Sequence, residues 1–186
     1  MKFGEYVQSV HEELLHTLSS VSKDEIEVLV DSIIKSERIF VAGAGRSGLM
    51  VKAFCMRLIH LGLDAFVVGE TITPNITEND LLIIGSGSGG TSTLVSIASK
   101  KALIGFNLCL VSIFPDSPIG RLADFTVKVP APTPKASSHE AFSSVQPMGS
   151  LFEQSLLLVL DIVIMCLMDR LEEDNTTMFS RHANLE

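Results

Sequence analysis

The chain has 186 residues, enough for one domain that buries about 70% of the surface exposed in its unfolded form. It carries 22 acidic and 14 basic residues without a cluster of Lys or Arg, so we expect no nucleic-acid partner. Apolar residues make up 46% of the chain, which predicts that some helix faces are buried between subunits. The N-terminus has no apolar secretion segment. The longest apolar run, 155–168, contains Asp161 and is shorter than the roughly 20 residues that span a membrane. We therefore expect a cytoplasmic protein with no membrane partner.

Two amphipathic helices are predicted ahead of the first strand. Apolar residues recur at helical spacing over residues 5–18. Ser22, followed three residues later by Glu25, is typical of a capping box that starts a second helix running to about residue 34. We expect residues 1–36 to form an N-terminal helical hairpin that serves packing or oligomerisation.

Five short apolar runs alternate with helical segments between residues 37 and 171. This alternation predicts an α/β fold, a three-layer sandwich in which a five-stranded parallel sheet carries helices on both faces, as in Rossmann-like proteins. A polar tail, 172–186, completes a single domain spanning residues 1–186. The strands are predicted at 39–42, 65–68, 81–84, 108–113 and 125–129. The helices are predicted after the first strand to about 61, at 92–103, briefly within 115–124, and at 150–171.

Two glycine- and hydroxyl-rich turns follow the first and third predicted strands. They read RIFVAGAGRSG over residues 38–48 and LLIIGSGSGGTS over residues 81–92. A buried strand that passes through such a turn into a helix leaves unpaired backbone N–H groups, which attract an anion. Because both turns lie at the carboxyl ends of parallel strands, we expect them to face one crevice. Hydroxyl groups at these turns suit a phosphomonoester; they belong to Ser47, Ser86, Ser88 and Thr91.

Other readings of the turns remain open. One alternative is a dinucleotide-binding protein. The sequence fingerprint of such proteins needs an acidic residue at the end of the second strand, and Glu70 lies there. The turns also fit a structural role without any ligand. The chain has no GxxxxGK[ST] or HExxH motif, so we expect no nucleotide triphosphate, no metal and no cofactor. Its three cysteines show no CxxC spacing and are expected to be buried, reduced thiols.

The last predicted helix carries one carboxylate, Glu153, in its first turn. A first-turn glutamate often only complements the helix dipole at a wet surface. On so apolar a helix, however, we expect it to face a semi-buried cleft, where it is a candidate general base. The preceding stretch, 130–149, is rich in Pro and Ser and is expected to form a functional loop or lid. His182, in the tail, is by default a surface histidine.

Several separate motifs resemble the 6-phospho-3-hexuloisomerases, a branch of the sugar-isomerase (SIS) domain family. The resemblance extends from Arg38 to Glu186 and rests, in this order, on GAGRSG, AFCMRLIHLG, VGETITP, GSGSGGT, QPMGSLFEQ and RHANLE. It implies an SIS-type fold and a homotetramer. It also implies interconversion of D-arabino-3-hexulose 6-phosphate and fructose 6-phosphate, the second step of the ribulose monophosphate pathway for formaldehyde fixation. Related arabinose phosphate isomerases have an HGDL-type motif after the second strand, and its histidine is missing from VGETITPNITENDL, which favours the hexuloisomerase branch.

The resemblance also implies the roles of individual residues. Glu153 becomes the base that transfers a proton through a cis-enediol(ate), without a metal. His182 becomes a second catalytic group, acting in its own or a neighbouring subunit. Relatives often have a charged residue where this chain has Gly90. The implied contacts with the phosphorylated hexulose are Gly45, Arg46, Ser47, Ser86, Gly87, Ser88, Gly89, Gly90 and Thr91.

Two other functions compete with this interpretation. The first is another aldose–ketose phosphate isomerase of the SIS type. The second is a phosphosugar-sensing regulatory module, because SIS domains also serve in regulators. Regulators usually add DNA-binding helices with basic residues, whereas the N-terminal helices predicted here are acidic to neutral.

Overall fold

A computed structural model describes residues 2–132 and 143–185 of the chain. Its centre is a five-stranded sheet in the order β2-β1-β3-β4-β5, in which all neighbouring strands are parallel. Gly43, the last residue of β1, pairs with Gly85, the last residue of β3, so these two strands end level with each other. The strands are β1 (Ile39–Gly43), β2 (Ala65–Val67), β3 (Leu81–Gly85), β4 (Asn107–Ser112) and β5 (Phe125–Lys128).

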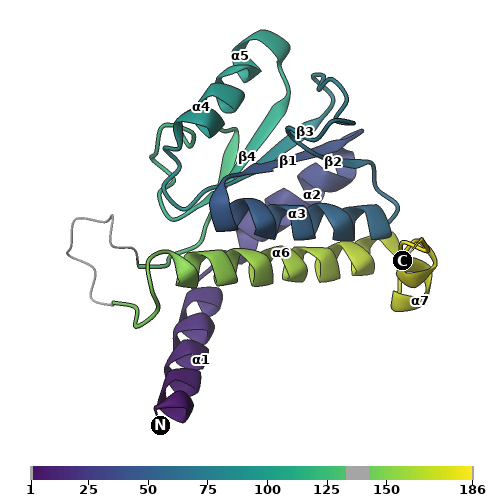
Figure 1. Ribbon diagram of the computed structural model, residues 1–186. Coiled ribbons are helices and arrows are strands. Elements are labelled where there is room, and N and C mark those ends of the chain that lie inside the picture. Colours follow the sequence, from purple (N-terminus) through teal and green to yellow (C-terminus); the bar gives the residue numbers. More distant parts are fainter. Residues whose placement is uncertain (1, 133–142, 186) are drawn as a thin grey trace.

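Helices cover both faces of the sheet, which confirms the predicted three-layer α/β fold (Figure 1). Alternate strand residues point to opposite faces. One face packs against α2, α3 and α6 in the larger core, and the other packs against α4 in a smaller one. The helices are α1 (Phe3–Ser19), α2 (Lys23–Lys35), α3 (Gly45–His60), α4 (Ser92–Ser99), α5 (Lys101–Ile104), α6 (Ser150–Leu171) and α7 (Asn175–Ser180).

The two N-terminal helices exist as predicted, but they do not form a hairpin packed on itself. α1 packs mainly against α6 and projects from the body, whereas α2 packs against α6 and β5 (Figure 1). The predicted capping box is only half formed. Ser22 accepts the N–H of Glu25 at 3.4 Å, but the Glu25 carboxylate accepts the N–H of Lys128 at 2.8 Å instead of turning back. This cross-link holds α2 on β5.

Two predicted helices differ from the structure. The helix expected over 92–103 is divided into α4 and α5, and Gly105 ends it in the left-handed conformation. The short helix expected within 115–124 is a series of turns. Its cause is long-range, because the N–H of Ile119 donates to the carbonyl of Gly89 at 2.9 Å instead of to a carbonyl one turn earlier.

α6 is the long apolar helix predicted over 150–171. Within the described residues it is the one helix long and apolar enough to cross a membrane, because it continues beyond the run 155–168 at both ends. Length and composition alone are weak grounds, since the core helix of a soluble protein passes the same test. Here α6 lies beside α3, and nine of its side chains are buried (Figure 1). This burial is that of a core helix.

Candidate active site

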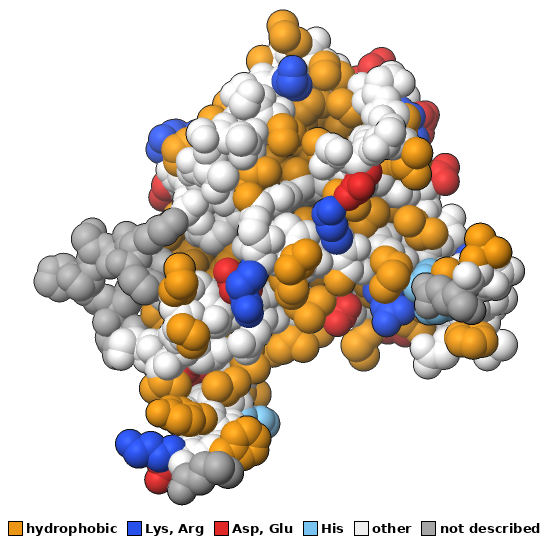
Figure 2. All heavy atoms as spheres, in the orientation of Figure 1, with side chains coloured by type: hydrophobic (Ala, Val, Ile, Leu, Met, Phe, Trp, Pro, Cys, Tyr) orange, Lys and Arg blue, Asp and Glu red, His pale blue; other side chains and the backbone are white. Residues whose placement is uncertain are grey.

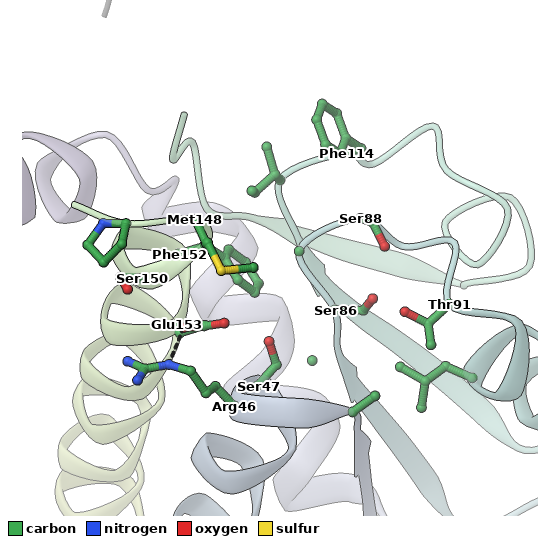
Figure 3. A pocket seen from close by; sticks show the side chains of 17 residues that line it. Arg46, Ser47, Ser86, Ser88, Thr91, Phe114, Met148, Ser150, Phe152 and Glu153 are labelled. Atoms are coloured by element: carbon green, nitrogen blue, oxygen red, sulfur yellow. Dashed lines mark hydrogen bonds and ion pairs between the residues drawn. The ribbon is translucent and has the colours of Figure 1, made fainter. Parts of the chain in front are cut away.

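A cavity of about 500 Å³ opens at the carboxyl ends of β1 and β3, where α6 begins (Figure 3). The chain leaves β1 toward β2 on one side and leaves β3 toward β4 on the other, so the two connections diverge there. Such a switch point is the usual ligand site of an open parallel sheet. The cavity is lined by residues from 44–47, 85–91 and 147–153, together with Leu94, Ile113 and Phe114.

The first turn aims the start of α3 at the cavity. A side chain on Gly43 would place its Cβ 2.9 Å from the Cα of Gly48, so this approach of strand to helix needs glycine. α3 begins at Gly45, with only Ala44 between the strand and the helix. The N–H groups of its first residues, Gly45, Arg46 and Ser47, have no acceptor within the helix and carry the positive end of its dipole. This end of α3 therefore attracts an anion.

The second turn is fixed by hydrogen bonds to the chain after β4. The carbonyl of Gly87 accepts from the Ser112 hydroxyl at 3.1 Å and from the N–H of Ile113 at 3.3 Å. Because the C=O and N–H of a trans peptide point in opposite directions, these bonds turn the N–H of Ser88 away from β4. The carbonyl of Gly89 is likewise held by Ile119. The carbonyls of Gly87 and Gly89 are thus held by the chain after β4 and are not available to face a ligand.

The hydroxyl groups of this turn remain able to donate. The oxygen of Ser86 accepts the N–H of Gly89 at 3.2 Å, and that of Ser88 accepts the N–H of Gly90 at 3.3 Å. A hydroxyl oxygen that accepts a bond still holds its own hydrogen. Both groups can therefore donate to phosphate oxygens, which accept several short hydrogen bonds.

Glu153 and Arg46 meet at the opposite wall. Glu153 lies in the first turn of α6 with 19% of its side chain exposed, and Arg46 is the second residue of α3 with 61% exposed. The Nε–H of Arg46 donates to the Glu153 carboxylate, as the dashed line in Figure 3 marks. One carboxylate and one cation therefore lie beside the anion-attracting turns.

The residues predicted for the site fall into two groups by position. Gly45 and Gly89 lie outside the cavity lining and shape the turns with φ angles of +57° and +56°. Gly90 also lies outside it, and an added Cβ there would be 3.7 Å from the nearest atom, so the position has room for a side chain. The predicted residues that line the cavity are Arg46, Ser47, Ser86, Gly87, Ser88, Thr91 and Glu153 (Figure 3).

His182 lies at the other end of α6, outside the cavity of its own chain. Its ring is 5.2 Å from that of His60 and 5.9 Å from that of Phe179. The 22 residues of α6 span about 33 Å, so His182 and Glu153 do not meet within one chain. Burial, together with Arg57 and His182, lowers the pKa of His60. The predicted action of His182 therefore depends on a neighbouring subunit.

The other sequence-based candidates lie elsewhere. Glu70 pairs with Lys52 at 2.5 Å and lies outside the cavity lining, so the structure gives no support to the dinucleotide alternative. Within residues 2–132 and 143–185, no three His, Cys, Asp or Glu side chains are arranged to hold a metal. Cys55 and Cys109 are buried and Cys166 is half-buried, all unbridged. Part of the predicted lid, residues 133–142, lies outside the described residues, while 147–149 line the cavity.

Two residues that were not predicted from the sequence support the site from outside. Ser112 fixes the second turn, and Glu13 of α1 binds residues 144–146 just before the cavity. A signal for Glu13 existed, because it lies three residues after Val10 and four before Thr17, on the side of α1 that carries apolar residues. Ser112 gave no signal apart from its place at a strand end.

Relatives of known name are similar to the whole chain. A 3-hexulose-6-phosphate isomerase from Bacillus subtilis is 47% identical over 186 residues, covering all of both chains. One of the same name from Mycobacterium gastri is 41% identical and covers 95% of this chain and 88% of its own. A Methanococcus jannaschii protein, whose crystal structure is described as inferring a 3-hexulose-6-phosphate isomerase function, matches with a TM-score of 0.85. It is 35% identical, covering 98% of this chain and 99% of its own.

The family pattern described as the SIS domain matches residues 32–158. This range includes both turns, all five strands and Glu153. The chain therefore belongs to the SIS domain family.

Proposed function

We propose that the chain is an isomerase that interconverts D-arabino-3-hexulose 6-phosphate and fructose 6-phosphate. The observation that carries this proposal is the joining, in one cavity, of two anion-attracting turns and a single carboxylate, Glu153. The hexulose phosphate isomerases of B. subtilis and M. gastri, similar over nearly their whole length, support it.

The turns hold the phosphate group of the sugar. The N–H groups at the start of α3 and the hydroxyls of Ser47, Ser86, Ser88 and Thr91 donate to its oxygens. The chain has a net charge of −8, so this attraction is local and comes from backbone dipoles and Arg46. Fixing the phosphate brings the reacting carbons to Glu153 and turns remote binding energy into orientation.

Glu153 moves a proton between C2 and C3 of the open-chain sugar. Its carboxylate removes the proton from C2 of the 3-ketose, which gives a cis-enediolate, and returns it to C3. The C2 hydroxyl loses its proton and becomes the carbonyl, while the oxygen on C3 gains one. The Arg46 guanidinium, already beside Glu153, stabilises the enediolate oxygen.

Assembly and pathway belong to the same proposal. The protein is a cytoplasmic homotetramer that serves the second step of the ribulose monophosphate pathway of formaldehyde fixation. In this assembly His182 of one subunit reaches the site of a neighbour and carries the proton between the two oxygens. Apolar side chains gather on the face of the molecule shown in Figure 2, and they support contacts between copies. The exposed apolar residues of α1, α3 and α6 include Tyr6, Val7, Met56, Ile59, Ile162 and Met165.

A coupled assay that follows the formation of fructose 6-phosphate tests the activity. Glu153→Gln should lower kcat by about 10²- to 10⁴-fold and leave phosphosugar affinity nearly unchanged, because the base is lost and the turns are intact. Glu70→Gln, which removes an exposed charge outside the cavity, is the matched control and should behave as wild type. Near-normal turnover in Glu153→Gln would remove Glu153 from the role of base. Tight phosphosugar binding by the wild-type protein without turnover would favour the regulatory module.

A further inference from the structure

Glu13 is a buried carboxylate on a helix that otherwise lies largely at the surface. Only 5% of the residue is exposed. Its Oε1 accepts the N–H of Val145 at 2.6 Å, and its Oε2 accepts the hydroxyl of Ser144 at 2.7 Å and the side-chain amide of Gln146 at 2.9 Å. Burying a carboxylate is unfavourable unless its oxygens are satisfied, and this one binds three donors in succession. Glu13 is therefore built to hold residues 144–146.

The segment held by Glu13 leads directly into the wall of the cavity. Residues 147–150 line it, and the N–H of Glu153 donates to the carbonyl of Gly149 at 3.0 Å in the first turn of α6. Only 9% of Gln146 is exposed, so this residue of the segment is packed and not free in solvent. Any shift of residues 144–146 is thus passed to the start of α6.

A backbone conformation in this wall also needs support. Met148 has φ +55°, in the left-handed region that side chains other than glycine rarely adopt. Such a conformation persists only where the surroundings fix the chain on both sides. On the side toward α6, the N–H of Ser150 donates to the carbonyl of Pro147 at 3.1 Å. On the other side, the fixed point is Glu13.

We propose that Glu13 is a positioning residue: from the N-terminal helix, it holds the wall of the active-site cavity so that Glu153 faces the substrate. Glu13 lies outside residues 32–158, which match the SIS domain. The N-terminal helix thus takes part in the site as well as in packing. The kinetic side of this proposal rests on the proposed isomerase function, whereas its structural side does not.

The test compares two substitutions in α1. Glu13→Leu removes all three acceptor contacts while keeping most of the volume. Leu18→Ala weakens the packing of the same helix and removes none of the three hydrogen bonds of Glu13. Glu13→Gln is the conservative variant, since its single carbonyl oxygen still accepts the N–H of Val145. For each, we would measure kcat, KM for the hexulose phosphate, the midpoint of thermal unfolding and amide hydrogen exchange of residues 144–153.

Glu13→Leu should lower kcat by about 10- to 100-fold with a smaller change in KM, because Glu153 is misplaced and the phosphate turns are not. Amide exchange of residues 144–153 should accelerate. Glu13→Gln should recover part of kcat, and Leu18→Ala should lower the unfolding midpoint while leaving kcat and this exchange as in wild type. If Glu13→Leu does not fold, Ser144→Ala removes one contact from the other side and should give a smaller loss of kcat.

Two results would overturn the proposal. One is a Glu13→Leu enzyme that folds and keeps both wild-type kcat and wild-type exchange over residues 144–153. The other is a Leu18→Ala enzyme that loses kcat as much as Glu13→Leu, which would reduce Glu13 to a packing residue. If wild type shows no isomerase activity, the proposed function fails, and the exchange comparison between these variants still decides the role of Glu13.

Discussion

The polar groups where the strands begin (the amino edge of the sheet) and those where the strands end (the carboxyl edge) are used differently. At the amino edge, Arg38 before β1 donates to both oxygens of Asp80 before β3, at 3.0 and 2.7 Å. The same carboxylate accepts the N–H and the hydroxyl of Thr77 at 2.6 and 2.9 Å, and it is fully buried. Before β5, Asp124 accepts the N–H of Leu108 at 2.7 Å and pairs with Lys101 at 2.9 Å. The side chains of Arg38, Asp80 and Asp124 are thus engaged in holding the starts of the strands together.

The carboxyl edge keeps its donors available. There β1 and β3 end in glycine, Gly43 packs directly on Gly48, and the N–H groups that start α3 have no acceptor within the helix. The second turn is supported from the side of β4, where the hydroxyl of Ser112 donates to the carbonyl of Gly87. The amino edge thus stabilises the sheet, whereas the carboxyl edge leaves hydrogen-bond donors for a ligand. Substitutions at the two edges should therefore have different effects.

Asp80→Ala should give the largest effect and should be confined to stability. It leaves Arg38 and Thr77 without their buried partner, so the free energy of unfolding should fall by about 3 kcal/mol, measured by urea denaturation. KM for the phosphosugar should not change. The exposed Asp31→Ala, which loses pairs with Lys35 and Arg170, is the control and should lose less than about 1 kcal/mol. A large rise in KM for Asp80→Ala would erase the distinction between the edges.

Gly43→Ala should disturb both stability and binding. The new Cβ would meet the backbone of Gly48 at 2.9 Å and Val51 at 3.1 Å, and a backbone cannot yield as a side chain does. We expect a loss of about 2 kcal/mol in unfolding free energy and a rise in KM, because the start of α3 is displaced. Gly4→Ala, with nothing within 4 Å of the added Cβ, should leave KM unchanged and should not lower stability, because alanine favours a helix more than glycine does. A rise in KM without any loss of stability would show that the close packing is not what aims α3.

Ser112→Ala should weaken binding while leaving the reaction step intact. Without this hydroxyl, the carbonyl of Gly87 keeps only the longer bond from Ile113, the N–H of Phe114 loses its acceptor at 3.1 Å, and the second turn loosens. Each hydrogen bond is worth about 1 kcal/mol, so the free energy of unfolding should fall by about 1 to 2 kcal/mol and KM should rise by roughly fivefold, with kcat little changed. Ser99→Ala, on the exposed face of α4, is the control. A fall in kcat with unchanged KM would assign Ser112 to the reaction instead of to the grip on phosphate.

Asp80 at the amino edge should contribute to the loss of stability in acid. Burial acts to raise the pKa of Asp80, but the hydrogen bonds from Arg38 and Thr77 outweigh it and hold the pKa below its ordinary value of 3.8. The stabilisation is thus complete above that value and is lost as the pH falls through the lowered pKa. Unfolding free energies measured below pH 5 should fall less steeply in Asp80→Asn than in wild type. Equal slopes would remove Asp80 as the cause.

The fold could be predicted where structure follows from local pattern. Buried parallel strands appear as continuous apolar runs, and α6 was predicted with the bounds that it has. Prediction failed where a contact distant in sequence decided the structure. Ile119 bonds to Gly89 and prevents a helix, and Glu25 bonds to Lys128 and opens the capping box. The orientation of α1 likewise follows from its packing on α6.

The features of the site likewise divide into those that local sequence predicts and those that depend on distant contacts. Both turns could be predicted to face one crevice, because the carboxyl ends of parallel strands share an edge. The pairing of Arg46 with Glu153 could not be predicted, because these residues are 107 positions apart in the sequence. The contacts of Glu13 could not be predicted either, because they join residues more than 130 positions apart. The role of His182 belongs to neither group, because its predicted contact lies in a neighbouring subunit and the geometry of one chain does not determine that contact.

The late position of α6 in the chain has a consequence for synthesis. Side chains such as Leu156, Leu160 and Val163 complete the larger core, and they leave the ribosome after every strand has emerged. Until then, the apolar surfaces of α3 and of the sheet beneath it remain in water, a state that favours aggregation and recruits chaperones. A nascent chain released before α6 would carry both glycine turns, yet it would lack Glu153 and the helix that covers its core.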